Sequence, residues 1–249
     1  MKTILLRLAD GRPVLEYVTD VTGSGLPVAH VGFIHPLYTP GGKVITDLAP
    51  PDHPHHRGVF LAWYAMHGKV DGDFWGWGAH APVDGRRIVN RSAEVTGTTL
   101  RARNEWLAGD TVMLTEETTI TCREPFVVDI EYRLTPAFDL RLAQSAFAGF
   151  CVRLPRQRPV RFFHSAGEVK LPDPHYQQPA TCWPDASWYR AEVEGVGSVT
   201  VTPAVGNPPA GWFNHRELKM LNPCITAPGE LRLAGGQPFT LGYRLAMAG

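Results

Sequence analysis

The sequence predicts an all-β protein that folds as an antiparallel β-sandwich. In several segments, apolar and polar residues alternate with a period of two. This alternation places one set of side chains on a buried face and the other set in water. Glycine (25 residues) and proline (22 residues) recur along the chain and divide it into short segments. Many short strands separated by turns are typical of sandwiches and barrels.

The strands are expected where the alternation is regular and turn-forming residues stand at both ends. The clearest case is 127–134, where one face carries Val128, Ile130, Tyr132 and Leu134. The other strands are expected at residues 3–6, 13–18, 59–64, 88–95, 99–106, 112–120, 148–154, 198–202 and 239–245. No window repeats apolar residues at i, i+3, i+4 and i+7 over three turns, so the pattern favours strands throughout.

The length of 249 residues suits one large β domain, and nothing marks a linker between two folded halves. We therefore expect a single β-sandwich domain over residues 1–249. Two stretches, 36–80 and 171–188, interrupt the strand pattern and are rich in proline, histidine and aromatic residues. Long ordered loops in compact domains are more often functional than idle, so both are candidate site regions.

The composition limits the partners. Lys+Arg and Asp+Glu balance at 24 each, which argues against nucleic acid because phosphate binding favours a basic surface. No apolar run approaches the ~20 residues of a membrane helix, and the first residues do not resemble a signal peptide. The four scattered cysteines are therefore expected to be reduced, mostly buried thiols in a cytoplasmic protein. Balanced charge and open sheet edges are also compatible with a homodimer.

The strongest candidate for a site is the segment 52–58, which contains His53, His55, His56 and Arg57. Imidazole is the side chain whose unperturbed pKa lies nearest neutrality, so such a cluster suits proton transfer or metal ligation. In an extended segment, His53 and His55 would point to one side and could chelate a divalent metal ion such as zinc, iron or manganese.

Further ligands of such a metal ion would come from His67, Asp71, Asp73 or Glu217. Without a metal, one histidine would act as a general acid or base, and Arg57 would stabilise an anionic intermediate. The third interpretation is a polar turn whose histidines only hydrogen-bond to the backbone. No cofactor other than a divalent metal ion is indicated.

Aromatic residues follow the histidine cluster, notably Trp75 and Trp77. Exposed indole rings stack on the C–H face of a pyranose ring, and Arg57 could then hold its hydroxyl groups. Alternatively, these tryptophans are large anchors of the core.

A third group lies at 212–217, where His215 and Glu217 face the same way and Arg216 stands between them. Glu217 is the preferred general base or metal ligand of this group, although a surface charge pair of little energetic value is the alternative. Weaker candidates are Glu168 and Arg153, of which Arg153 is either an inward-facing cation or the cap of a strand edge. The sequence has no G-x-S-x-G, glycine-rich phosphate loop or H-E-x-x-H, so serine hydrolases, nucleotide-dependent enzymes and zincins are not indicated.

Several of these segments resemble an uncharacterised bacterial family whose members automatic naming often calls PmoA or methane oxygenase. The match rests on residues 35–42, 52–58, 70–75, 147–155, 186–188 and 212–217, and it covers nearly the full chain. Membrane methane oxygenase subunits carry transmembrane helices, which this sequence lacks, so that activity is not expected.

The resemblance implies a supersandwich like that of galactose mutarotase, a fold shared by sugar epimerases, lyases and carbohydrate-binding domains. In mutarotases a histidine and a glutamate exchange protons with the sugar ring. Similar proteins are often encoded beside sugar oxidoreductases, which implies a role in saccharide catabolism.

We therefore predict a carbohydrate-active enzyme that moves a proton on a sugar or an oxidised sugar derivative, as an epimerase, a lyase or a glycoside hydrolase. A clustered histidine would be the acid and Glu217 the base, on the concave face of one sheet. The predicted catalytic residues are His53, His55, His56, His215 and Glu217. The predicted substrate-binding residues are Arg57, His67, Asp73, Trp75, Arg153, Glu168, Trp188 and Arg216. Two alternatives stay open: a metal-dependent, cupin-like lyase, hydrolase or oxygenase with His53 and His55 as ligands, and a non-catalytic carbohydrate-binding domain.

Overall fold

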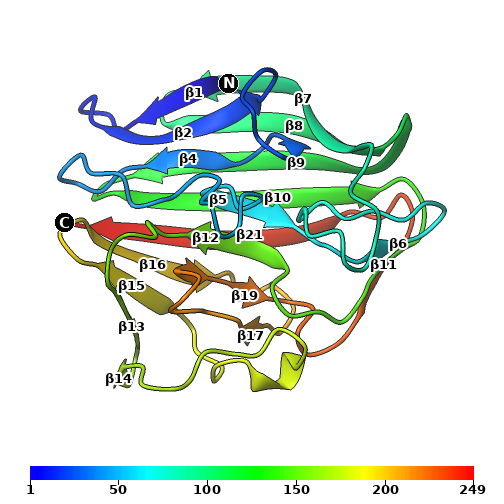
Figure 1. Cartoon of the computed structure of the whole chain (residues 1–249). Helices are drawn as coiled ribbons and strands as arrows, with labels where there is room; N and C mark the ends of the chain where they lie inside the picture. The colour runs from blue at the N-terminus through cyan, green and yellow to red at the C-terminus, as the bar shows by residue number, and fades with distance from the viewer.

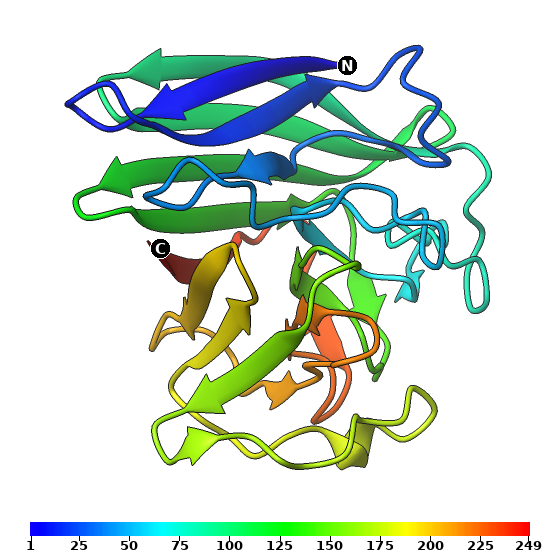
Figure 2. The same ribbon diagram turned by 60° about the vertical axis from the view of Figure 1, so that its left-hand side comes forward.

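Two sheets stacked face to face form the body of the computed structural model, which describes residues 1–249. Figure 1 and Figure 2 both show the layer that contains β1, β2 and β4 lying against the layer of β7 to β10. The predicted fold class, an all-β antiparallel sandwich, is confirmed.

The larger sheet has ten strands. Their order is β14 (Gly167–Glu168), β13 (Val160–His164), β15 (Tyr189–Val193), β16 (Gly197–Pro203), β21 (Phe239–Ala248), β10 (Val127–Pro136), β9 (Thr111–Arg123), β8 (Thr99–Ala108), β7 (Arg86–Thr96) and β3 (Ala29–His30). All neighbours in this sheet are antiparallel except β3 and β7, which pair in parallel.

The smaller sheet has six strands. Their order is β1 (Lys2–Arg7), β2 (Pro13–Asp20), β4 (Ile34–Leu37), β5 (Val59–Ala62), β12 (Gly149–Arg153) and β18 (Met220–Leu221). The remaining elements are short. They are a sheet of β20 (Leu231–Leu233), β11 (Leu140–Leu142) and β6 (Met66–His67), a pair of β17 (Gly211–Trp212) and β19 (Pro223–Cys224), and one 3-10 turn, η1 (Pro179–Thr181).

Every segment predicted as a strand contains one, within a few residues of the expected ends. The alternation in 127–134 corresponds to β10, where Val128, Ile130, Tyr132 and Leu134 are all buried. The strands β13 and β15 were not predicted, because their runs are short and mix arginine, glutamate and alanine with the apolar residues. The prediction of free, mostly buried thiols is confirmed. All four cysteines are free; Cys122, Cys151 and Cys224 are buried, and Cys182 is partly exposed.

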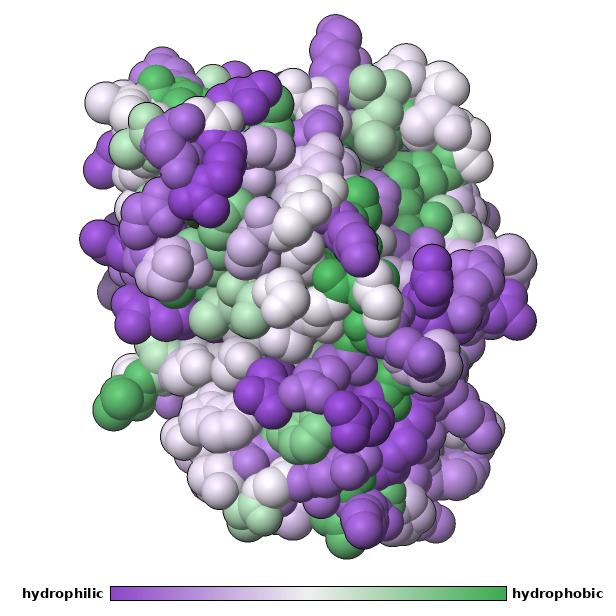
Figure 3. Space-filling view, turned by 90° about the vertical axis from the view of Figure 1, so that its left-hand side faces the viewer, coloured by the Kyte–Doolittle hydropathy of each residue, from purple (hydrophilic) through white to green (hydrophobic).

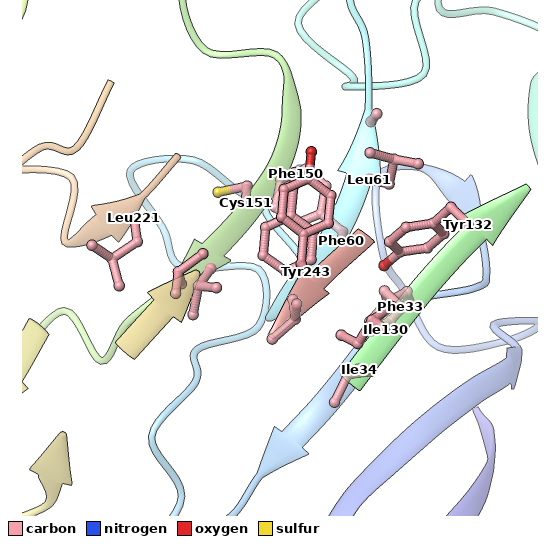
Figure 4. Close-up of a cluster of buried hydrophobic side chains, with 14 of the residues drawn as sticks. Phe33, Ile34, Phe60, Leu61, Ile130, Tyr132, Phe150, Cys151, Leu221 and Tyr243 are labelled. Carbon is pink, nitrogen blue, oxygen red and sulfur yellow. The ribbon is translucent and has the colours of Figure 1, made fainter. Parts of the chain in front are cut away.

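The core lies between the two sheets as one connected cluster that extends from Leu6 to Met247. Figure 4 shows part of this cluster, in which Phe150 of β12 and Tyr243 of β21 stack with ring centroids 4.0 Å apart. Burial of an aromatic side chain of this size stabilises the fold by about 1.5–3 kcal/mol. Such contacts across the layers fix the position of the loops that connect the strands.

A buried polar network also joins the two sheets. The amide of Asn104 in β8 donates hydrogen bonds to the hydroxyl of Tyr17 in β2 (2.8 Å) and to the carboxylate of Glu116 in β9 (2.8 Å). The indole N–H of Trp106 and the hydroxyl of Thr118 donate to the same carboxylate. Glu116 is fully buried, and burial raises its pKa above the ordinary value although these hydrogen bonds oppose the rise.

The surface is mixed. On the face drawn in Figure 3, hydrophobic residues occur in small groups among hydrophilic ones. No helix of the protein has the length and hydropathy that crossing a bilayer would require.

Candidate functional site

A pocket of about 380 Å³ gathers the most distinctive residues of the sequence. Its volume lies in the range of about 300–1,000 Å³ that is usual for small-molecule sites. The lining residues are His53, His55, His56, Trp75, Trp77, Phe147, Pro174, His175, Tyr176, His215, Glu217, Leu218 and Met220. Segments separated by more than 150 residues of sequence therefore meet at one site.

The pocket is formed by loops, and of its lining residues only Met220 lies in a strand. This candidate pocket therefore lies at the connections between strands, whereas the sequence predicted a site on the concave face of one sheet. The inward faces of both sheets are occupied by the apolar core, so the polar side chains stand in the connections between strands.

The histidine cluster is held in turns and is not extended. The N–H of His53 donates to the carbonyl of Pro50 (3.0 Å), and the N–H of His56 donates to the carbonyl of His53 (3.0 Å). The three rings consequently pack on one another: His53 and His56 stack with centroids 4.9 Å apart, and the ring of His55 meets that of His56 edge to face at 4.8 Å.

Metal ligation requires at least three suitable side chains around one point, as well as the right ligand types. Nowhere in the chain do three or more His, Cys, Asp or Glu side chains come together in this way. The predicted chelating pair of His53 and His55 is thus not part of such a set, because the turns direct the rings at each other. The structure therefore offers no preformed set of three such ligands to the metal-dependent alternative.

Two charged residues behind the cluster set its electrostatics. Arg153, fully buried, donates to Nδ1 of His56 (3.1 Å) and to the carboxylate of Asp52 (2.8 Å). Burial raises the pKa of Asp52, but the hydrogen bonds and charge of Arg153 and the contact with His53 outweigh it and bring the pKa to about 2. Arg153 does not line the pocket, so its predicted contact with a substrate is replaced by a contact with His56.

Two imidazoles of the cluster stay neutral at neutral pH. Burial, followed by the nearby charge of Arg57, lowers the pKa of His55 to about 3. Burial together with the neighbouring cations also lowers the pKa of His56 far below the ordinary value. These environments disfavour the cationic form of both rings, which is the form in which an imidazole is the stronger acid.

Arg57 and Asp73 support the pocket from behind and do not line it. The buried guanidinium of Arg57 donates to the carbonyls of Phe74 (3.1 Å), His55 (3.2 Å) and Trp75 (3.4 Å). These hydrogen bonds connect the histidine loop (52–58) with the tryptophan loop (74–78). The buried carboxylate of Asp73 accepts hydrogen bonds from three consecutive backbone N–H groups, those of residues 76–78. The predicted substrate contacts of both residues are therefore replaced by contacts that shape the two loops.

His215 and Glu217 enter the pocket from the loop before β18. Nδ1 of His215 lies 3.1 Å from the carboxylate of Asp173 and 3.2 Å from the backbone N of Leu218. Burial lowers the pKa of His215, although the negative charge of Asp173 acts in the opposite direction. The side chain of Glu217 is exposed, and its backbone N–H donates to Asp173 (3.1 Å).

Asp173 was not predicted from the sequence, yet it organises this side of the pocket. It also accepts hydrogen bonds from the backbone and the guanidinium of Arg216. Arg216 further donates to the carbonyls of Val169 and Leu171, and its guanidinium lies over the ring of Trp183 at 4.8 Å. These contacts occupy the guanidinium, so Arg216 is not a lining residue.

The remaining predicted substrate contacts lie elsewhere. His67 pairs with the surface carboxylate of Asp71 at 3.3 Å, Glu168 is exposed in β14, and Trp188 is half-buried outside the pocket. Trp77, interpreted from the sequence either as a stacking surface or as a core anchor, lines the pocket, and so do Phe147, His175 and Tyr176, which were not among the predicted site residues. The proline-rich stretch 171–188 was the available signal for His175 and Tyr176, since it was recognised as an interruption between strands.

Comparison with one solved structure shows a similar fold across the whole chain. A galactose mutarotase related enzyme from Lactobacillus acidophilus is similar with a TM-score of 0.57 and 8% sequence identity, over 100% of this chain and 98% of that chain. Galactose 1-epimerase from Lactobacillus acidophilus NCFM matches with a TM-score of 0.44 and 8% identity, over 100% and 99% of the two chains.

No curated protein matches the sequence. A family model does match it, over residues 6–249. The chain therefore belongs to the family of unknown function DUF6807.

Proposed function

We propose that the pocket binds a sugar or an oxidised sugar derivative and that the protein moves a proton on it, as an epimerase, a lyase or a glycoside hydrolase does. The observation that carries this proposal is the composition of one pocket: imidazoles, a carboxylate and aromatic rings line the same 380 Å³ cavity. Imidazole and carboxylate groups are the usual general acids and bases of enzymes.

The aromatic side chains supply surfaces on which a sugar ring can stack. Trp77 and Tyr176, each partly exposed, meet edge to face with centroids 5.8 Å apart at the pocket. Such rings offer an apolar face and a polar edge, which suits a ligand with C–H faces and hydroxyl edges. The fold, shared with a galactose mutarotase related enzyme, is compatible with a carbohydrate ligand.

Among the lining residues, Glu217, His53 and His215 are the proposed proton carriers. The carboxylate of Glu217 is solvent-accessible within the pocket and makes no ion pair, which leaves both oxygens available to a ligand. Nδ1 of His53 lies 3.2 Å from the carboxylate of Asp52, and a carboxylate in this position orients a catalytic imidazole and stabilises its protonated form. Nδ1 of His215 lies 3.1 Å from the carboxylate of Asp173 but accepts a hydrogen bond from the backbone N–H of Leu218, so the proton of the neutral ring resides on Nε2.

The test is an NMR assay in D₂O with a panel of monosaccharides, uronic acids and keto-aldonic acids. We expect one class of the panel to exchange a carbon-bound hydrogen for deuterium, to change its configuration, or to lose a leaving group. Glu217→Gln should lower this turnover by about 10²–10⁴-fold, because general acid–base catalysis typically contributes that much. Substrate affinity should change much less, since the amide keeps the shape of the side chain.

Matched controls come from outside the pocket. Glu168→Gln alters an exposed glutamate of β14, and His67→Asn alters a histidine of β6; neither residue lines the cavity. Both variants should retain full turnover. Sugar binding without any turnover would instead indicate a carbohydrate-binding domain, and the absence of binding by every sugar class would contradict the proposal.

A further inference from the structure

The imidazoles of His53 and His56 are neighbours in the pocket with different partners behind them. Their rings stack at 4.9 Å with an angle of 27° between the planes. Nδ1 of His53 lies 3.2 Å from Oδ2 of Asp52, whereas Nδ1 of His56 lies 3.1 Å from a guanidinium nitrogen of Arg153. Asp52 and Arg153 are themselves joined at 2.8 Å, so the four side chains form one chain of contacts.

These partners decide which ring nitrogen carries the proton in each histidine. A guanidinium group can only donate, so Nδ1 of His56 accepts and its single proton resides on Nε2. A carboxylate can only accept, so Nδ1 of His53 donates and its Nε2 keeps a lone pair. The hydrogen bond that one ring nitrogen makes generally fixes the tautomer in this way.

The stacked rings therefore offer a ligand two complementary groups. Both residues line the cavity, and Nε2 of each ring makes no hydrogen bond to another protein group. Nε2 of His53 is a hydrogen-bond acceptor and a base, and Nε2–H of His56 is a donor that stays uncharged.

We propose that Asp52 and Arg153 hold His53 and His56 in opposite neutral tautomers, and that this pair recognises a sugar carbonyl with an adjacent acidic C–H group. The inference rests on the proposed function, because it names a substrate class for the same pocket and the roles of His53 and His56 in that pocket. The substrate class is an oxidised sugar, that is, a keto sugar or a keto-aldonic acid. Asp52 and Arg153 are positioning residues in this arrangement, since they act through the two imidazoles.

The chemistry of such a pair is proton abstraction beside a carbonyl. The C–H bond breaks, its proton moves to Nε2 of His53, and the electron pair enters a new C=C bond. The carbonyl oxygen takes the negative charge and accepts the hydrogen bond from Nε2–H of His56. The imidazolium of His53 is stabilised by Asp52 and exchanges its proton with solvent, and return of a solvent-derived proton from Nε2 to the same face of the carbon completes the hydrogen exchange.

A neutral imidazole is known to polarise a carbonyl without giving up its proton. His56 fits this role because burial, and after it the charged and imidazole groups around it, among them Arg153, disfavour its protonated form. The role that the sequence suggested for Arg57, stabilisation of an anionic intermediate, would thus fall to His56.

The test is ¹⁵N NMR of the uniformly labelled full-length protein, in which protonated and unprotonated imidazole nitrogens resonate far apart. For the wild type we expect protonated Nδ1 and bare Nε2 in His53, and the reverse in His56. In Asp52→Ala, His53 loses the acceptor of its Nδ1 proton, so both of its neutral tautomers should be populated. The tautomer of His56 should stay unchanged, because Arg153 still donates to its Nδ1. Arg156→Met is the matched control: it removes an exposed guanidinium 3.8 Å from the same carboxylate, and it should change neither ring.

The ligand class is tested by titrating the wild type with 5-keto-D-gluconate and with D-gluconate, which differ only in the carbonyl. The keto acid should shift both Nε2 resonances and bind about tenfold more tightly, the value of one net hydrogen bond. It should also take up deuterium beside the carbonyl in D₂O.

Identical tautomers in the two wild-type rings would overturn the inference whatever sugar binds. Opposite tautomers with equal affinity for the two acids, or with no response to either, would overturn the carbonyl assignment. In both cases the broader proposal of a sugar site is decided separately, by the sugar panel and Glu217→Gln.

Discussion

At the scale of single residues, some buried polar groups find several hydrogen-bond partners, whereas others, such as both ring nitrogens of His30, find none. Glu116 belongs to the first kind, because its carboxylate lies between the sheets and accepts hydrogen bonds from Asn104, Trp106 and Thr118. Burial nevertheless disfavours the charged form, and the pKa of Glu116 is raised. This residue therefore makes the stability of the fold depend on pH.

The sign of this dependence follows from the raised pKa. The unfolded chain ionises Glu116 near about 4.3, whereas the folded protein ionises it at a higher pH. The stabilisation from the neutral form is fully present below the unfolded pKa and is lost as the pH rises through the folded pKa.

We expect Glu116→Gln to remove this pH-dependent part of the stability. The variant should be less stable overall, because an amide N–H would face the indole N–H of Trp106. Denaturant unfolding of both proteins between pH 4 and pH 8 measures the difference. If the two free energies of unfolding run parallel over this range, Glu116 does not titrate as described.

At the scale of elements, the loops that build the pocket depend on close backbone contacts. Gly76 stands between the two tryptophans with φ +103°, and a Cβ there would lie 2.7 Å from Cγ1 of Val28 and 2.8 Å from Cβ of His55. The tryptophan loop and the histidine loop can approach this closely only because residue 76 has no side chain.

Gly76→Ala should accordingly push the two loops apart, shift the imidazole resonances of His55 and weaken sugar binding. Gly78→Ala is the matched control, because Gly78 also has a positive φ (+76°) but its nearest contact would be 3.4 Å, to Val83. Both variants carry backbone strain, on the order of 1–3 kcal/mol. Equal effects of the two substitutions on the His55 resonances would show that the close approach has no role in the pocket.

The elements were predictable from the sequence to the extent that their patterns are local. The alternation in 127–134 sufficed to place β10, because one face of the strand meets the core and the other meets solvent. The conformation of 52–58 was not predictable in this way. An extended segment and a pair of turns use the same residues, and the turns form because the N–H groups of His53 and His56 find carbonyls within the loop.

At the scale of the whole molecule, the sandwich brings distant loops together at one cavity. The residue types of the candidate site could be read from the sequence, and His53, His55, His56, His215, Glu217 and Trp75 do line the pocket. Which of these residues line the pocket and which support it from behind could not be read from the sequence, because this depends on partners that are distant in the sequence. Arg57, Arg153 and Arg216 are directed to carbonyls, carboxylates and a histidine that no local pattern specifies.

The most direct test of the account is a crystal structure of the protein with the sugar of the panel that binds most tightly. We predict that the sugar occupies the 380 Å³ pocket, with polar atoms near the imidazoles of His53 and His56 and the carboxylate of Glu217. One face of its ring should lie against Trp77 or Tyr176. A sugar bound elsewhere on the molecule, with this pocket filled only by solvent, would contradict the account.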